Sequence, residues 1–246
     1  MLSKSHIKYI QSLHHKKFRD EEGAFIAEGN KVVMELLQSK KFICKEIIAL
    51  PEWILENEAA LLKYYKNDRV EAKDFELEKI SALSTPNNVI AVFEKKKQEP
   101  AKVSGKITLA LDTLQDPGNL GTVIRIADWF GIASIVCSAS SADMYNPKVV
   151  QSTMGSLARV NIIYTDLLTW LQQNKNIKTF AAALDGEPVN TIKHIKEAII
   201  IIGNESKGIS DPVMQLANKK ITIPKIGEAE SLNAAVATGI ILSHLT

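Results

Sequence analysis

Between residues 105 and 246, short apolar runs alternate regularly with segments of helical character, and this alternation constrains the fold more than any other feature. Six runs have the length of buried strands and are bounded by turn-forming residues. These expected strands are Ile107–Leu111, Ser134–Cys137, Ala158–Ile163, Thr179–Leu184, Ala198–Ile202 and Ile221–Ile223. The expected helices between and after them are Leu120–Phe130, Pro147–Met154, Leu167–Asn174, Asp211–Lys219 and Ser231–Leu245. Such alternation predicts an α/β fold with a mostly parallel sheet that helices cover on both faces.

Residues 1–100 predict a separate, smaller α/β domain. Strands are expected at Ala24–Ala27, Lys45–Ala49, Arg69–Glu71 and Val89–Phe93. Helices are expected at Lys4–Phe18, from about Asn30, at Pro51–Lys66 and at Phe75–Leu83. The polar run at about 94–104 breaks the periodicity, and we interpret it as a linker to a second domain at 105–246. A surface loop within a single domain is the alternative.

Composition excludes several classes of protein. The formal net charge of +2 gives no global signature of nucleic-acid binding. Basic residues nevertheless gather at residues 1–19, which contain no acid, so this segment is either a contact for a polyanion or a solvated helix. No stretch approaches the length of a transmembrane helix, and we expect no membrane partner. The two cysteines, Cys44 and Cys137, lie far apart, which predicts neither a disulfide framework nor a metal site and fits the cytoplasm.

Ligands of parallel sheets bind beyond the carboxyl ends of the strands. Three loops occupy such positions here, namely Asp112–Gly121, Gly203–Gly208 and Lys225–Ser231. Either they form a common ligand site or they are ordinary turns between strands and helices. Ser231 is predicted to be the N-cap of the last helix, with Asn233 in its first turn.

Arg125 interrupts an otherwise apolar helix, where an arginine is usually paired or functional. An ion pair with Asp128 or Asp112 is the structural explanation. The functional explanation is that Arg125 reaches back toward the strand ends, since only about 9 Å of helix rise separates it from Asn119.

Three sequence motifs resemble those of a known protein family. Asn119-Leu-Gly-Thr-Val-Ile-Arg125, Ile201-Ile-Gly-Asn-Glu205-Ser-Lys-Gly-Ile and Ile223-Pro, followed by Ser231-Leu-Asn233-Ala-Ala-Val-Ala, occur in this order. Together they resemble the SpoU (TrmH-type) RNA 2'-O-ribose methyltransferases of the SPOUT superfamily. Thr153-Met-Gly155-Ser resembles a further family element, and GAFIAEGNKVVMELL is similar to the family's L30-like substrate-binding domain.

The resemblance implies S-adenosylmethionine as the cofactor, held in a C-terminal trefoil knot formed by about residues 198–246. It implies that the cofactor-binding residues are Leu184, Gly203, Asn204, Ile223 and Leu232. It also implies a homodimer, for which the small residues of the last helix are suited, although packing within one subunit explains them as well.

The implied reaction is methyl transfer to a ribose 2'-OH, with Asn119, Arg125, Glu205, Ser231 and Asn233 as the catalytic set. The family's usual proposal makes Arg125 the base. A guanidinium is normally never deprotonated in proteins, so the alternative is that Arg125 holds a phosphate and stabilises the alkoxide while Glu205 handles the proton.

The implied partner is RNA, with ribosomal RNA favoured over transfer RNA, and not DNA. Two rival functions remain at this point. One is a SPOUT enzyme that methylates a base, and the other is a non-catalytic RNA-binding or ribosome-assembly protein with the same fold.

Overall fold

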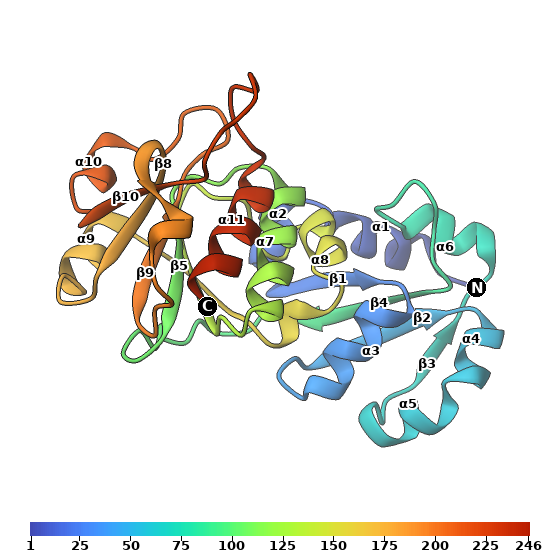
Figure 1. Cartoon of the computed structure of the whole chain (residues 1–246). Helices are drawn as coiled ribbons and strands as arrows, with labels where there is room; N and C mark the ends of the chain where they lie inside the picture. Colours follow the sequence, from blue (N-terminus) through green and yellow to red (C-terminus); the bar gives the residue numbers. More distant parts are fainter. The chain divides into compact units, whose positions relative to one another are not determined.

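The structure, a computed structural model, describes the whole chain from Met1 to Thr246 and divides into two compact units (Figure 1). Unit 1 contains Met1–Lys97 and Asp143–Arg159, and unit 2 contains Gln98–Ala142 and Val160–Thr246. The segment Asp143–Arg159 therefore packs with the N-terminal residues, although in the sequence it lies between two strands of unit 2.

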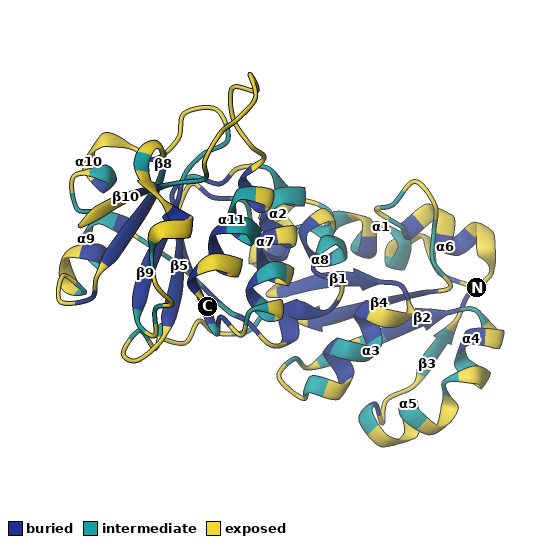
Figure 2. Cartoon of the chain, in the orientation of Figure 1, coloured by how far each residue is buried: buried dark blue, intermediate teal, exposed yellow.

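Unit 2 is built on a six-stranded sheet in which every pair is parallel. Its strands follow the spatial order β10-β8-β9-β5-β6-β7. Their bounds are β5 (Ile107–Leu111), β6 (Ser134–Ser138), β7 (Asn161–Thr165), β8 (Thr179–Pro188), β9 (Ala198–Ile202) and β10 (Lys219–Thr222). The central strands β5, β6 and β9 are buried along their whole length (Figure 2). The α/β fold with a mostly parallel sheet is thus confirmed.

Helices cover both faces of this sheet. On one face, α9 (Leu167–Gln173) and α10 (Asp211–Met214) pack Leu171 and Val213 onto apolar residues of the strands. On the other face, α7 (Pro117–Trp129) packs against α11 (Ala234–Leu245) (Figure 1). A Cβ at Gly239 of α11 would lie 3.6 Å from Ile126 Cδ1 of α7, an ordinary van der Waals distance, so this glycine faces α7.

Unit 1 contains a four-stranded mixed sheet with the order β1-β4-β2-β3. Its strands are β1 (Ala24–Glu28), β2 (Cys44–Ala49), β3 (Arg69–Glu71) and β4 (Val89–Glu94). Its helices are α1 (Lys4–Ser12), α2 (Lys16–Glu22), α3 (Asn30–Ser39), α4 (Pro51–Glu56), α5 (Glu58–Tyr64), α6 (Asp74–Ile80) and α8 (Pro147–Ser152). The helices α1 and α6 bury Ile10, Leu13, Leu77 and Ile80 in a core shared with apolar residues of the sheet.

Several predicted boundaries are wrong, each for a local reason. The expected helix Lys4–Phe18 is two helices, because the chain turns at Leu13–His15. The expected helix Pro51–Lys66 is divided at Asn57, whose side chain donates to the carbonyl of Trp53.

Two expectations in unit 2 also change. The strand expected at Ala158–Ile163 starts only at Asn161, because Ser156–Ala158 form a 3₁₀ turn after Gly155, whose φ is +93°. The helix expected at Asp211–Lys219 ends at Met214, and Lys219 already belongs to β10.

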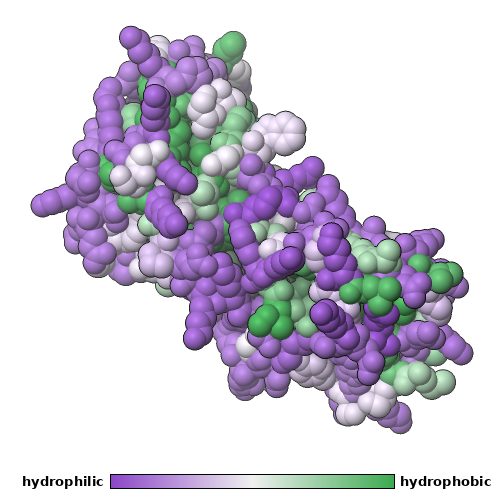
Figure 3. Space-filling model, turned by 90° about the horizontal axis from the view of Figure 1, so that it is seen from below, coloured by the Kyte–Doolittle hydropathy of each residue, from purple (hydrophilic) through white to green (hydrophobic).

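The surface is mainly hydrophilic, with small apolar patches between the charged groups (Figure 3). None of the helices combines the length and apolar character that crossing a lipid bilayer demands.

A buried arginine ties Asp143–Arg159 into unit 1. Arg19 is only 1% exposed, and its Nη2 donates to Asp143 Oδ2 at 2.6 Å. Its Nη1 donates to the carbonyls of Leu13 and His14 at 3.0 and 2.8 Å. The guanidinium thus binds a largely covered carboxylate, 12% exposed, and the turn between α1 and α2 together, which a lysine cannot do with one amine.

We predict that Arg19→Ala lowers the free energy of unfolding by about 3–5 kcal/mol, because it leaves Asp143, whose side chain is only 12% exposed, without its charge partner. Urea unfolding followed by circular dichroism measures this loss. Lys17→Ala is the matched control, since Lys17 and Glu21 form only an exposed pair at 3.9 Å. Equal unfolding midpoints for the two variants would contradict the prediction.

Candidate active site

The candidate active site lies in unit 2, where three loops leave the carboxyl ends of neighbouring strands. Asp112 follows β5, Gly203 follows β9, and Ile223 follows β10. Because β9 pairs with β5 on one side and with β8 on the other, the parallel register brings these loops to one edge of the sheet.

Three of the predicted site residues form one hydrogen-bonded chain. Asn119, in the first turn of α7, donates from Nδ2 to Glu205 Oε1 at 2.9 Å. Asn233 donates from Nδ2 to Asn119 Oδ1 at 2.8 Å. Residues more than 80 positions apart in the sequence are thus joined through side chains, and each of the three motifs contributes one of them.

Hydrogen bonds at the N-termini of α7 and α11 hold the two asparagines of this chain in place. Asp116 is the N-cap of α7 and accepts from the N–H of Asn119 at 2.7 Å. Asn233, not Ser231, is the N-cap of α11, so the prediction for Ser231 is wrong. The reason is that Asn233 Oδ1 accepts from the N–H groups of Ala235 and Val236, and the helix begins at Ala234.

The loop Gly203–Gly208 is closed by its own backbone. Asn204 and Gly208 exchange two N–H···O bonds, each 2.9 Å long. Asn204 Oδ1 accepts from the N–H groups of Ser206 and Lys207, and its Nδ2 donates to the carbonyl of Thr113 at 2.8 Å. Asn204 therefore fixes both the shape of this loop and its distance from the loop after β5.

Sequence reasoning missed the residues that support this arrangement. Asp112 is buried and accepts from both N–H and Oγ of Ser210, at 2.8 and 2.7 Å. Thr113 has a φ of +58°, which is unusual for a β-branched residue, and its N–H donates to Ser138 Oγ at 2.8 Å. The serine-rich run after β6 was the available signal for such a support, whereas nothing in the sequence marks Thr113.

Two predicted catalytic residues are not part of the hydrogen-bonded chain. Arg125 is exposed on α7 and makes no hydrogen bond or ion pair, so it pairs with neither Asp128 nor Asp112. Ser231 is exposed in the segment before α11 and has no hydrogen-bond partner. Arg125 is therefore available to a ligand, and the structural explanation by an internal ion pair does not hold.

The residues expected around the cofactor lie within β8, directly after β9 and β10, and before α11. Leu184 in β8 is 76% exposed, and Leu232 before α11 is 49% exposed. The carbonyl of Leu184 accepts from Thr222 Oγ1 at 3.2 Å, which ties the middle of β8 to the end of β10 beside Ile223. Gly203 leaves no space for a side chain, since a Cβ there would lie 2.3 Å from the carbonyl carbon of Gly208. Exposed apolar side chains beside closely packed backbone fit an adenosine moiety.

Neither cysteine is suited to nucleophilic chemistry. Burial raises the pKa of the Cys137 thiol in β6, and burial raises the pKa of Cys44 in unit 1 to about 12. Both thiols are therefore neutral at physiological pH, and only a thiolate attacks.

Comparisons with known proteins agree with this geometry. Residues 106–243 match the model of the SpoU rRNA Methylase family, and residues 4–91 match that of an MRM3-like substrate binding domain. The chain belongs to the SpoU rRNA methylase family. The first match covers the three motifs whose asparagines and glutamate meet at the strand ends.

Individual members of this family resemble the chain along nearly its whole length. It is 31% identical to the 23S rRNA (guanosine(2553)-2'-O)-methyltransferase RlmP of Bacillus subtilis, over 97% of this chain and 95% of that protein. A putative RNA methyltransferase of the TrmH family from Porphyromonas gingivalis has a TM-score of 0.85 and 37% identity, covering 99% and 98% of the two chains. An AdoMet-bound rRNA methyltransferase from Sinorhizobium meliloti has a TM-score of 0.87 and 29% identity, covering 99% and 95%.

We predict that the two roles of Asn233 can be separated. Asn233→Ala removes both the cap and the bond to Asn119, and should lower the free energy of unfolding by about 1–2 kcal/mol. Asn233→Ser keeps an oxygen that can cap α11 and should cost clearly less. Urea unfolding of the three proteins measures both differences, and an equal loss in the two variants would refute the capping role.

Proposed function

We propose that this protein transfers a methyl group from S-adenosylmethionine to a ribose 2'-OH of ribosomal RNA. The observation that carries the proposal is the chain Asn233–Asn119–Glu205, which joins the three family motifs at the strand ends of unit 2. The B. subtilis relative, matched over nearly the full length of both chains, is named for the same reaction on 23S rRNA.

The cofactor would be held by Leu184, Gly203, Asn204, Ile223 and Leu232. Bound there, S-adenosylmethionine supplies an electrophilic methyl group. The exposed leucines offer apolar contact for the adenosine, and Asn204 keeps the loop after β9 in shape. The S. meliloti relative, whose solved structure is AdoMet-bound, supports the choice of cofactor.

The catalytic residues would position the ribose and accept the proton that leaves its 2'-hydroxyl. Arg125, which has no internal partner, would hold an RNA phosphate and stabilise the negative charge that develops on the 2'-oxygen. Glu205 uses Oε1 to hold Asn119 and keeps Oε2 to accept the proton. Asn119, Ser231 and Asn233 would orient the ribose. Arg125 itself as the base remains the alternative within the same reaction.

The remaining parts of the proposal concern architecture. We propose that residues 1–100 form an L30-like domain that selects the RNA, with a linker at about 94–104 and the methyltransferase domain at 105–246. We also propose a trefoil knot formed by about residues 198–246. Support comes from β9, which lies between β5 and β8, and from α11, which returns from β10 at the sheet edge to pack on α7.

We propose that the protein acts in the cytoplasm as a homodimer that buries α11. Val236 of α11 is 51% exposed, and Trp129 at the end of the adjacent α7 is 85% exposed. Apolar groups of this size on two packed helices favour a partner surface. Light scattering should give about twice the chain mass of 27.2 kDa, and a stable monomer would refute the dimer.

The experiment that tests the reaction is transfer of a labelled methyl group to unmethylated ribosomal RNA, followed by alkaline hydrolysis. A 2'-O-methyl group removes the nucleophile needed for cleavage, so the site appears as a gap in the hydrolysis ladder. A labelled RNA without a gap would show base methylation and overturn the ribose assignment.

We predict that Arg125→Ala lowers the methyl transfer rate by about 10²–10³ while leaving the melting temperature unchanged. Arg125 is exposed and makes no internal bond, so its removal should not affect folding. Arg125→Lys should rescue poorly, because an ammonium cannot make a two-pronged contact. Lys175→Ala, at an exposed site beyond α9, is the matched control for loss of charge. Full activity of Arg125→Ala would defeat the assignment.

We predict that Gly203→Ala weakens S-adenosylmethionine binding by about tenfold or more. The new Cβ would lie 2.3 Å from Gly208, and the overpacked loop would have to move at a cost of about 1–3 kcal/mol. Gly227→Ala is the control, since nothing lies within 4 Å of the added atom. Titration calorimetry measures both affinities, and unchanged binding by Gly203→Ala would place the cofactor elsewhere.

A further inference from the structure

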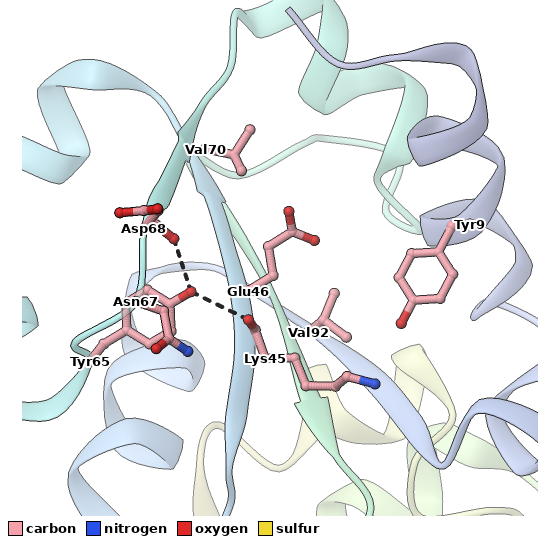
Figure 4. A pocket seen from close by; sticks show the side chains of 8 residues that line it. All are labelled: Tyr9, Lys45, Glu46, Tyr65, Asn67, Asp68, Val70 and Val92. Carbon is pink, nitrogen blue, oxygen red and sulfur yellow. Dashed lines mark hydrogen bonds between the residues drawn. The ribbon is translucent and has the colours of Figure 1, made fainter.

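Unit 1 contains a cavity of about 420 Å³ at the open end of the sheet face that α1 and α6 cover. Tyr9 of α1, Val70 of β3 and Val92 of β4 supply its apolar lining (Figure 4). Lys45 and Glu46 of β2 and the segment Asn67–Asp68 complete its lining. This volume lies within the range of small-molecule sites, and an apolar lining with a few polar groups is what such sites have in common.

A β-bulge aims an acidic side chain at this cavity. Cys44 pairs with Phe93 and Glu46 pairs with Val92, so Lys45 is an extra residue in β2. The shift places Glu46 in register with the residues whose side chains form the core, such as Ile48 and Val92. A carboxylate thus occupies a position where the pattern calls for an apolar side chain, and bulges with this effect are frequent at binding sites.

Only one oxygen of the Glu46 carboxylate has a partner in the protein. Its Oε2 lies 2.9 Å from His6 Nε2, and the two side chains are 23% and 24% exposed. Its Oε1 has no partner in the protein. In Figure 4 the carboxylate points into the space between Val70 and Tyr9. An ionised carboxylate only accepts hydrogen bonds, so a ligand that this oxygen binds must present N–H or O–H donors.

The opposite wall is rigid. The hydroxyl of Tyr65 donates to the carbonyls of Asp68 and Lys45, at 3.1 and 3.4 Å (Figure 4). Burial raises the pKa of Tyr65 to about 12, so this hydroxyl keeps its proton and both bonds at any physiological pH. The phenol ring of Tyr9 stands across the cavity from this wall, and its own hydroxyl has no partner.

We propose that this cavity binds the guanine base of an unpaired RNA nucleotide, stacked on Tyr9 with its Watson–Crick edge on Glu46. Guanine is the one common base with two adjacent donors on that edge, N1–H and N2–H, and a carboxylate accepts such a pair in a two-pronged contact. Adenine, cytosine and uracil each place an acceptor next to their donor and would oppose the carboxylate.

Three lysines near the cavity suit an RNA strand better than a free base. Lys45 is exposed at the mouth, and Lys4 and Lys8 are exposed on α1, the helix that carries Tyr9. These amines are suited to phosphates on either side of the bound nucleotide. The inference rests on the proposed action on RNA, and all the residues that line the cavity belong to unit 1.

The test compares fluorescein-labelled oligoadenylates that carry one central guanosine, inosine, adenosine, cytidine or uridine. Inosine lacks only the 2-amino group of guanosine. With the full-length protein at fixed salt, fluorescence anisotropy should show about tenfold tighter binding of the guanosine oligonucleotide than of the inosine one. Equal affinities for these two probes would overturn the inference, and so would the absence of binding by all five.

Two variants assign the preference to the cavity. Glu46→Gln should abolish the difference between guanosine and inosine, whereas Glu71→Gln, at an exposed position of β3, should retain it. Both changes remove one negative charge, so any general electrostatic gain in RNA affinity should be the same in the two variants. Tyr9→Leu should weaken binding of the guanosine probe by about tenfold through loss of stacking. Retention of the preference in Glu46→Gln would overturn the inference.

Two further measurements separate the possible failures. If guanosine monophosphate competes as strongly as the whole guanosine oligonucleotide, the ligand is a free nucleotide and the RNA proposal is overturned. If the wild-type protein methylates ribosomal RNA but shows no guanosine preference, only the cavity inference fails. If it neither methylates RNA nor binds any oligonucleotide, the proposed function fails as well.

Discussion

The candidate active site depends on the parallel pairing of β9 with β5 on one side and with β8 on the other. This pairing places the carboxyl ends of strands that are distant in the sequence at one edge of the sheet. The burial of β5 and β9 along their whole length, under helices on both faces, holds these two strands in the middle of the sheet. The loops can then be polar without loss of their positions.

Side-chain amides rather than apolar contacts set the geometry at that edge. Asn204 fixes its own loop and the carbonyl of Thr113, Asn119 links Glu205 to Asn233, and Asn233 also begins α11. An amide offers donors and an acceptor at once, so each of these residues serves two partners. The same bonds leave Glu205 Oε2 and the guanidinium of Arg125 without internal partners, which is the condition for acting on a ligand.

In unit 1, by contrast, ion pairs between side chains hold segments of the chain together. Arg19 is buried with Asp143, and Arg159 pairs with Glu35 beside Gly155, where a Cβ would lie 2.6 Å from Glu35. These contacts bind Asp143–Arg159 to unit 1, although in the sequence this segment lies between β6 and β7 of unit 2. At the sheet face that α1 and α6 cover, by contrast, His6 contacts only one oxygen of Glu46, and the other oxygen has no partner in the protein.

The sequence alone determined most element types and the parallel sheet, because apolar periodicity is a local property. The three site residues that meet, Asn119, Glu205 and Asn233, were named from the family motifs and not from periodicity. Ile107–Leu111, Arg69–Glu71 and Ala198–Ile202 were predicted to the residue. Tertiary structure decided the rest, including the early end of the helix at Met214 and the strained Thr113 held by Ser138. It also decided the placement of Asp143–Arg159 in unit 1. These outcomes rest on partners far away in the chain, and hydrogen bonds between distant residues leave no periodicity in the sequence.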